Sequence, residues 1–261
     1  MSNEPFFRRD GDLYQPTQAS RGPWGPTTLH GRVVAGLLAH AIEQRHGAPD
    51  LTPARFTIDM YRMPDLSAAE VTVTPIRDGH RVKLIDAEYR VGGVSMARAT
   101  CQFLRTSENP EGAVWSPPNW DAPLPGDIPP PSDGRSAMGG MWAIRRISGD
   151  FGVFGPEKRL WMSEVRELVE GEALTPFVRV ALAADFASPF ANSGDKGLGW
   201  INSDITLYLH RRPTTPWIGF EVKNHGETAG VAIAECWLYD EAGPIGTSSV
   251  AALAQKRRPG G

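Results

Sequence analysis

The chain has 261 residues, of which 41% are hydrophobic and 22% charged, and its formal net charge at pH 7 is −3. This length allows one large domain or two small ones, and the hydrophobic fraction argues against global disorder. Because acidic and basic residues are mixed along the chain, we expect no nucleic-acid partner and no binding to a membrane surface. The polar N-terminus and the lack of a long apolar run argue against a signal peptide and against membrane insertion.

The two cysteines, Cys101 and Cys236, each lie in a strand-like segment. They show no Cys-x-x-Cys spacing and have no histidine at metal-ligand spacing, so the sequence predicts no metal site. As free buried thiols they fit a reducing compartment, and we therefore expect a cytoplasmic protein.

The first half predicts a hairpin, a helix and an antiparallel meander. Residues 6–16 are expected to form the hairpin, and residues 29–44 carry apolar side chains at helical spacing. The meander strands are expected at residues 56–63, 69–77, 80–91 and 94–105.

A proline-rich segment divides the chain, which predicts an N-terminal unit at 1–106, a linker at 107–135 and a C-terminal unit at 136–261. Trp115 and Trp120 suggest that the linker lies pinned along a surface. The second half repeats the order of the first. Its helix is expected at 174–186 and its strands at 142–147, 159–167, the segment before Pro213, 217–225, 229–239 and 245–256.

The repeat can be followed by residue number. When Pro64 is aligned with Pro213, Phe56-Thr57-Ile58 falls on Ile205-Thr206-Leu207 and Arg62 falls on Arg211. This predicts a fused pair of similar units, each with short strands curled around one long helix. Chance similarity between two strand meanders is the alternative.

The strand before Pro213 contains a carboxylate that needs an explanation. Ile205, Leu207 and Leu209 fall on one face, whereas Asp204 lies on the other. A half-buried ionised Asp is costly unless it is paired or used. Asp204 therefore either caps a turn or pairs with a nearby arginine, or it handles a water molecule in a cleft.

Three segments carry a resemblance to a known family: Leu29–Leu38, Asn202–Pro213 and Leu238–Gly246. They resemble the helix opening, the second-half strand and the last hairpin of the acyl-CoA thioesterase II-like family. The resemblance implies an α+β double hot-dog fold, in which two antiparallel curled sheets each wrap around a long helix within one chain.

The resemblance also implies hydrolysis of acyl-CoA thioesters to a free acid and CoA. In that family an Asp, a polar residue and a Gln position the attacking water. The Asp carries over onto Asp204, and the polar residue falls near His225 and Thr228, although a lone His at this place also suits a plain turn. The last strand has no Gln at the expected position, and Ser248 or Ser249 would have to replace it in part.

Further candidate site residues come from the residues themselves. Asn202 stands two residues before Asp204 and is expected to share its face and orient it. Backbone N–H groups at the helix start, in His30-Gly31-Arg32, are the candidate oxyanion donors and substrate contacts. Gly31 would allow close approach, and His30 also reads as an ordinary helix-start residue.

The substrate would need an apolar slot and a cationic mouth. The acyl chain is expected to run along the first helix, where Ala35, Gly36 and Ala39 leave room. CoA phosphates need Lys or Arg at the cleft mouth, but the sequence singles out none. No metal or redox cofactor is expected, since CoA is part of the substrate, and the resemblance implies a homodimer or homotetramer.

Two other functions remain open at this stage. The missing Gln is also compatible with a non-catalytic acyl-CoA or acyl-ligand binding protein on the same scaffold. Residues 184–191 are similar to the Asp-x-Asn-Pro-x-His signature of hot-dog enoyl-CoA hydratases, but the spacing is one residue too long and the His is missing. Asp185 is therefore predicted to be a helix-end residue. Gly-x-Ser-x-Gly is absent, which disfavours an α/β-hydrolase.

Overall fold

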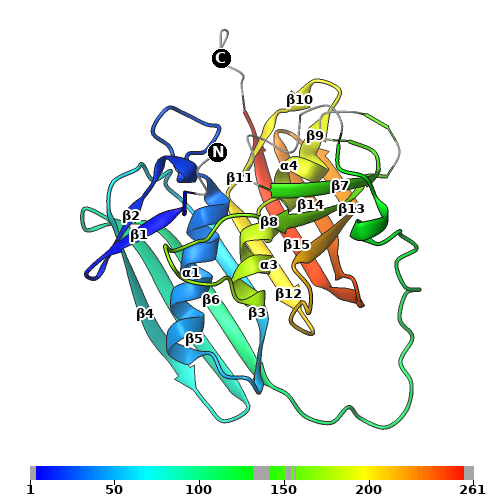
Figure 1. Ribbon diagram of the computed structural model, residues 1–261, viewed down its shortest axis with the longest axis horizontal. Coiled ribbons are helices and arrows are strands. Elements are labelled where there is room, and N and C mark those ends of the chain that lie inside the picture. Colours follow the sequence, from blue (N-terminus) through cyan, green and yellow to red (C-terminus); the bar gives the residue numbers. More distant parts are fainter. Residues whose placement is uncertain (1–3, 132–141, 151–153, 156, 256–261) are drawn as a thin grey trace.

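The computed structural model describes residues 4–131, 142–150, 154–155 and 157–255. Two helices, α1 (Gly31–His46) and α3 (Pro176–Ala184), lie side by side against a large antiparallel sheet (Figure 1). The first half contributes the strands β1 (Phe7–Asp10), β2 (Leu13–Pro16), β3 (Leu51–Met60), β4 (Ala69–Asp78), β5 (Val82–Val91) and β6 (Val94–Arg105).

The second half contributes the remaining strands. They are β7 (Trp142–Ser148), β8 (Arg159–Glu164), β11 (Trp200–Asn202), β12 (Asp204–Leu209), β13 (Trp217–Thr228), β14 (Val231–Asp240) and β15 (Gly243–Ala254). A short hairpin of β9 (Ser193–Gly194) and β10 (Gly197–Leu198) follows α4 (Ala187–Asn192). The architecture is the expected α+β double hot-dog fold.

Equivalent strands of the two halves follow in the same order when the sheet is read inward from either edge. In the described part of the chain, the order β1-β2-β4-β5-β6-β3 meets β12-β15-β14-β13-β8-β7. At the junction Thr57 lies opposite Thr206, Phe56 opposite Leu207 and Ile58 opposite Ile205. These are the residues that the sequence repeat aligns, so a pseudo-two-fold axis passes between the two threonines and the repeat is confirmed.

The two curled sheets are joined at their edges. Because β3 pairs with β12 through five residue pairs, the two curled sheets join into one continuous sheet. Buried side chains from both halves then form a single core around the helices. The helices run antiparallel, and a Cβ on Gly36 would come within 2.6 Å of Leu182, so this glycine lets them approach closely.

Part of the linker is pinned to the outer surface of the second half. The Trp120 ring stacks on Tyr239 with ring centroids 4.3 Å apart. It also lies where a side chain on Gly219 would be, so the glycine makes room for the ring. Trp161 Nε1 donates to Pro123 O at 2.9 Å. Trp115, by contrast, is 83% exposed, so only one of the two expected tryptophans is an anchor.

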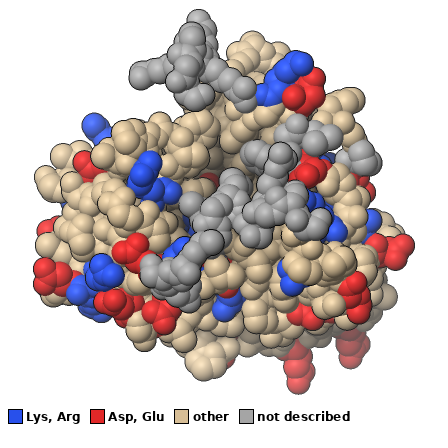
Figure 2. All heavy atoms as spheres, turned by 45° about the horizontal axis from the view of Figure 1, so that its top comes forward, with Lys and Arg blue, Asp and Glu red and all other residues tan. Residues whose placement is uncertain are grey.

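Charged groups of both signs are interspersed on the face shown in Figure 2. Among the described helices, none is both long enough and apolar enough to cross a membrane.

Candidate active site

A cavity of about 520 Å³ opens at the N-terminal end of α1, between the two halves of the chain. Its polar side is formed by His30, Gly31, Asp185 and Asn202. Its apolar side is formed by Leu29, Val34, Met60, Met63, Leu198 and Ile201. A few convergent polar groups in an otherwise apolar cavity are typical of a small-molecule site.

Asp185 reaches this cavity because the second-half helix breaks. It is the C-cap of α3, as the sequence predicts, and α4 begins two residues later. Pro189 lacks the N–H that would bond to the Asp185 carbonyl, and its ring would clash there in a continuous helix. The Asp185 carbonyl accepts from Ser188 N at 3.2 Å instead. The helix expected at 174–186 is found as α3, and α4 follows it as a further helix that the sequence analysis does not predict. The break between them places the carboxylate opposite α1.

His30 and Asp185 form a pair across the two halves. His30 Nδ1 lies 3.3 Å from Asp185 Oδ2, and both side chains are largely buried. The backbone N–H of Arg32 also points at Nδ1, at 3.5 Å. The shorter contact is to a charged acceptor, so we place the hydrogen on Nδ1, donating to Asp185. The other ring nitrogen, Nε2, then carries a lone pair.

The groups around Asp185 keep its carboxylate ionised. Burial by itself would raise its pKa, but hydrogen bonds from His30 and Asn202 and the positive charge of Arg32 outweigh it. The pKa of Asp185 therefore lies below its ordinary value. The Asn202 amide donates to Asp185 Oδ1 at 3.0 Å.

A β-bulge separates Asn202 from Asp204. Asn202 pairs with Ala252, and Thr206 pairs with Ser249. The chain therefore advances four residues from Asn202 to Thr206 while β15 advances only three, which leaves one extra residue in a bulge. The bulge turns Asn202 toward the helices. The prediction that Asn202 shares the face of Asp204 and orients its side chain is wrong, because its amide contacts only the Asp204 backbone carbonyl, at 3.2 Å.

Asp204 itself lies with the outward-facing residues of β12 and does not line the cavity. Its Oδ1 accepts from Ala251 N at 2.6 Å, which supplies an acceptor where the bulge interrupts the strand ladder. Burial raises its pKa, the Ala251 bond lowers it, and Asp59 on the facing strand raises it, with a net rise. A catalytic role for Asp204 stays a prediction.

The other residues predicted from sequence are spread over the molecule. Gly31 lies in the cavity, where a Cβ would come within 3.4 Å of both Asp185 carboxylate oxygens. Arg32 is fully buried, paired with Glu164 and stacked between aromatic rings, so its side chain faces away from the cavity.

His225 lines a second cavity, where Nδ1 lies 2.8 Å from Asn192 Oδ1. Thr228 is exposed, and its hydroxyl donates to the Glu227 carbonyl. Neither residue lines the cavity that holds His30 and Asp185.

Two expectations about the substrate slot change with the structure. The room expected at Gly36 is filled by Leu182, so no open slot continues along the helix there. The family Gln would fall at Val250 or Ala251, and neither lines the cavity. Ser248 donates to the Ala184 carbonyl and Ser249 to Glu235, so both are engaged elsewhere. Within the described residues, no cluster of His, Cys, Asp and Glu could hold a metal ion.

Comparison with protein families gives two matches. A family described as "Acyl-CoA thioesterase C-terminal domain" matches residues 117–253, and one described as "Acyl-CoA thioesterase N-terminal domain" matches residues 20–104. The comparison with curated proteins found no match.

The chain is similar in structure to several solved proteins. The TesB protein of Mycobacterium avium subsp. paratuberculosis is 14% identical, with a TM-score of 0.70 over 96% of each chain. A protein of unknown function with a hot-dog fold from Alicyclobacillus acidocaldarius is 14% identical, with a TM-score of 0.73 over 97% of this chain and 96% of that one. Acyl-CoA thioesterase II TesB2 from Mycobacterium marinum is 14% identical, with a TM-score of 0.65 over 96% and 95%. At these identities the likeness concerns the fold.

Proposed function

Because the chain belongs to the acyl-CoA thioesterase family, we propose that it hydrolyses acyl-CoA thioesters in the cavity at the start of α1. The observation that carries this proposal is the His30–Asp185 pair, which lies on the polar side of an otherwise apolar cavity. A positioned base with an oriented tautomer is what activation of a water requires.

In the proposed reaction, Asp185 holds the hydrogen on His30 Nδ1, and Nε2 takes a proton from water. The resulting hydroxide attacks the thioester carbonyl carbon and forms a tetrahedral oxyanion. When the C–S bond breaks, the CoA thiolate leaves and takes the proton from the imidazolium. The products are the free acid and CoA. Asn202 keeps Asp185 in place through its 3.0 Å hydrogen bond.

The start of α1 supplies the oxyanion site. Backbone N–H groups in the first turn of a helix lack intrahelical partners, and the helix dipole favours negative charge there. The Gly31 N–H is the proposed donor, because it is a first-turn amide of α1 on the wall of the cavity, next to His30. The apolar side of the cavity would receive the acyl group.

The test is thiol release from acyl-CoAs of short, long and aromatic acyl groups, with Asp185→Asn as the variant. Asn keeps the shape and an acceptor oxygen but cannot stabilise the imidazolium. We expect wild-type release to fall at least about 100-fold in the variant, with CoA binding retained. No release from any member, with CoA still bound, would reject hydrolysis and favour the non-catalytic binding protein.

The homo-oligomeric state and the cytoplasmic compartment expected from the sequence stay predictions. The homodimer or homotetramer expected from the family resemblance is checked by light scattering of the full chain. A monomer at all concentrations would reject it.

A further inference from the structure

The sequence repeat supplies two equivalent arginines with different surroundings. Arg62 and Arg211 each stand two residues before the aligned prolines, Pro64 and Pro213. The paired hairpins keep the same register, since β5 and β6 match β14 and β15 residue for residue. Asp240 therefore corresponds to Val91.

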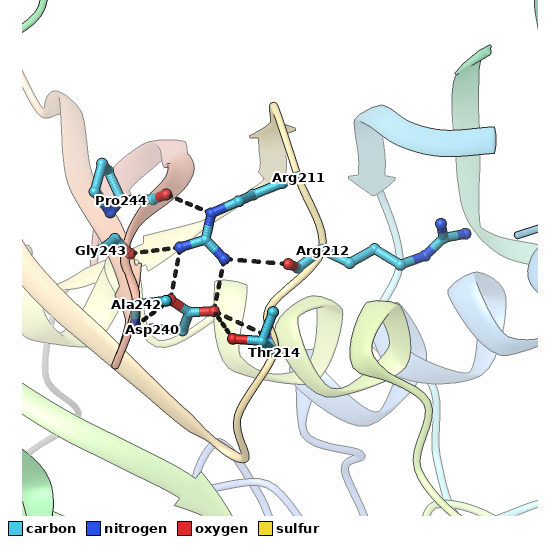
Figure 3. Close-up of polar contacts among 7 residues, drawn as sticks. All are labelled: Arg211, Arg212, Thr214, Asp240, Ala242, Gly243 and Pro244. Carbon is cyan, nitrogen blue, oxygen red and sulfur yellow. Dashed lines mark hydrogen bonds and ion pairs between the residues drawn. The ribbon is translucent and has the colours of Figure 1, made fainter. Parts of the chain in front are cut away.

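Arg211 is held in a complete hydrogen-bonded site (Figure 3). Its guanidinium binds both Asp240 oxygens, at 2.7 and 2.6 Å, and donates to the carbonyls of Gly243 and Pro244. The Asp240 side chain is fully buried. In the second half this arginine is thus a structural residue that fastens the end of β12 to the β14–β15 turn.

The first half lacks the partner for this role. Val91 has no carboxylate, and the following turn is Gly92-Gly93. Within the described residues, the Arg62 guanidinium makes no hydrogen bond or ion pair, and the residue is exposed. Asp59 and Asp65 each stand three residues from Arg62, and within the described residues neither pairs with it; Asp65 accepts from Ser67 N at 2.9 Å instead. The loss of Asp at this position leaves a cationic group available for a ligand.

Arg62 lies on the rim of the candidate active-site cavity. Three large apolar residues of the same cavity are also partly exposed around it: Trp24 at 40%, Tyr61 at 51% and Met63 at 48%. Exposed aromatic rings beside an unpaired guanidinium suit a ligand that is part apolar and part anionic. The reacting groups, His30 and Asp185, lie in the same cavity.

We propose that Arg62 binds a phosphate of the CoA moiety at the cavity mouth, beside Trp24 and Tyr61. This inference rests on the proposed function, because it takes acyl-CoA as the ligand. Guanidinium and phosphate form charge-assisted, often bidentate hydrogen bonds. Arg62 is thus a binding residue for the substrate tail, and it takes no part in the chemical step.

The test measures CoA binding by calorimetry, which needs no turnover, in the wild type and in Arg62→Ala and Arg62→Glu. Arg81→Glu is the matched control, because Arg81 is exposed in the β4–β5 turn, outside both cavities. We expect Arg62→Ala to weaken CoA binding about tenfold, Arg62→Glu to weaken it further, and Arg81→Glu to leave it unchanged. Added salt should narrow the difference.

A second measurement distinguishes the contribution of the phosphate groups to binding from that of the rest of the ligand. The KM for an acyl-CoA should rise about tenfold in Arg62→Ala, whereas the difference should disappear for the same acyl group on pantetheine, which has no phosphate. Unchanged CoA affinity in both Arg62 variants would overturn the inference. An equal rise in KM for the pantetheine thioester would do so as well. If CoA binding depends on Arg62 but no thioester is cleaved, the proposed hydrolysis fails and the binding role stands.

Discussion

Asp185 is ionised in a buried position because three groups face it. His30, Asn202 and Arg32 together outweigh the cost of removing the carboxylate from water. Loss of any one of them would raise the pKa of Asp185 toward its ordinary value or above. The charge of the carboxylate that orients His30 therefore depends on groups from both halves of the chain.

Asp204 gives a prediction at the same scale. Asp204→Ala leaves the Ala251 N–H in the bulge without its 2.6 Å acceptor and should cost about 1–3 kcal/mol of the free energy of unfolding. Asp204→Asn keeps a carbonyl oxygen at this place and should cost about 1 kcal/mol or less. Urea unfolding of the two variants makes the comparison. Equal stability of Asp204→Ala and wild type would show that the bond contributes nothing.

The sequence predicts part of this site. His30, Gly31 and Asn202 are expected candidates, and the structure brings them into one cavity. Asp185 is expected only as a helix end. The available signals were its similarity to the hydratase signature and Pro189 four residues later, which interrupts a helix at that point. Strand alternation put Asn202 on the same face as Asp204, but a bulge between them changes the register. No local sequence pattern predicts this bulge.

At the scale of elements, the Arg211–Asp240 pair fastens β12 to the β14–β15 turn. Burial would raise the pKa of Asp240, but bonds from Arg211, Thr214 and Ala242 lower it to about 2 from an ordinary 3.8. Because the folded pKa is depressed, ionised Asp240 stabilises the fold above pH 3.8. This stabilisation is lost as the pH falls from there through about 2.

Asp240→Asn should therefore destabilise the protein in a pH-dependent way. At pH 7 the Asn amide keeps one acceptor oxygen for Arg211 but removes the negative charge that pairs with the half-buried guanidinium, and this should lower the free energy of unfolding by about 1–3 kcal/mol. The gap between variant and wild type should narrow as the pH falls below 4, because Asp240 of the unfolded chain takes up a proton near pH 3.8 while folded Asp240 stays ionised until about pH 2. Urea midpoints at pH 7, 4 and 3 provide the measurement. A gap of constant size across this range would contradict the account.

The contact between α1 and α3 is set by packing between the two halves of the chain. Apolar spacing locates both helices to within a few residues. His30 stands at the N-cap position of α1, and the Thr175 hydroxyl accepts from Val178 N in the first turn of α3. The contact between them is not visible in either segment alone. In the sequence, Gly36 suggests open space beside the helix, yet Leu182 from the other half fills that space. Small residues on a helix can therefore mark a close neighbour instead of a ligand slot.

For the whole molecule, the duplication explains both the fold and its asymmetry. An offset of one repeat aligns Thr57 with Thr206, and these residues meet at the centre of the sheet. The sequence thus predicts the junction, although it does not show that the two sheets merge. Equivalent positions then differ between the halves: Arg211 is held by Asp240, whereas Arg62 at the cavity mouth has no side-chain partner among the described residues.

The most direct test compares Asp185→Asn with Asp204→Asn on the best acyl-CoA substrate, under single-turnover conditions. We expect Asp185→Asn to lose at least about 100-fold in rate, while Asp204→Asn stays within a few-fold of wild type. Circular dichroism and CoA binding would show that both variants are folded. The opposite result, with Asp204→Asn inactive and Asp185→Asn active, would contradict the account and place the chemistry at Asp204.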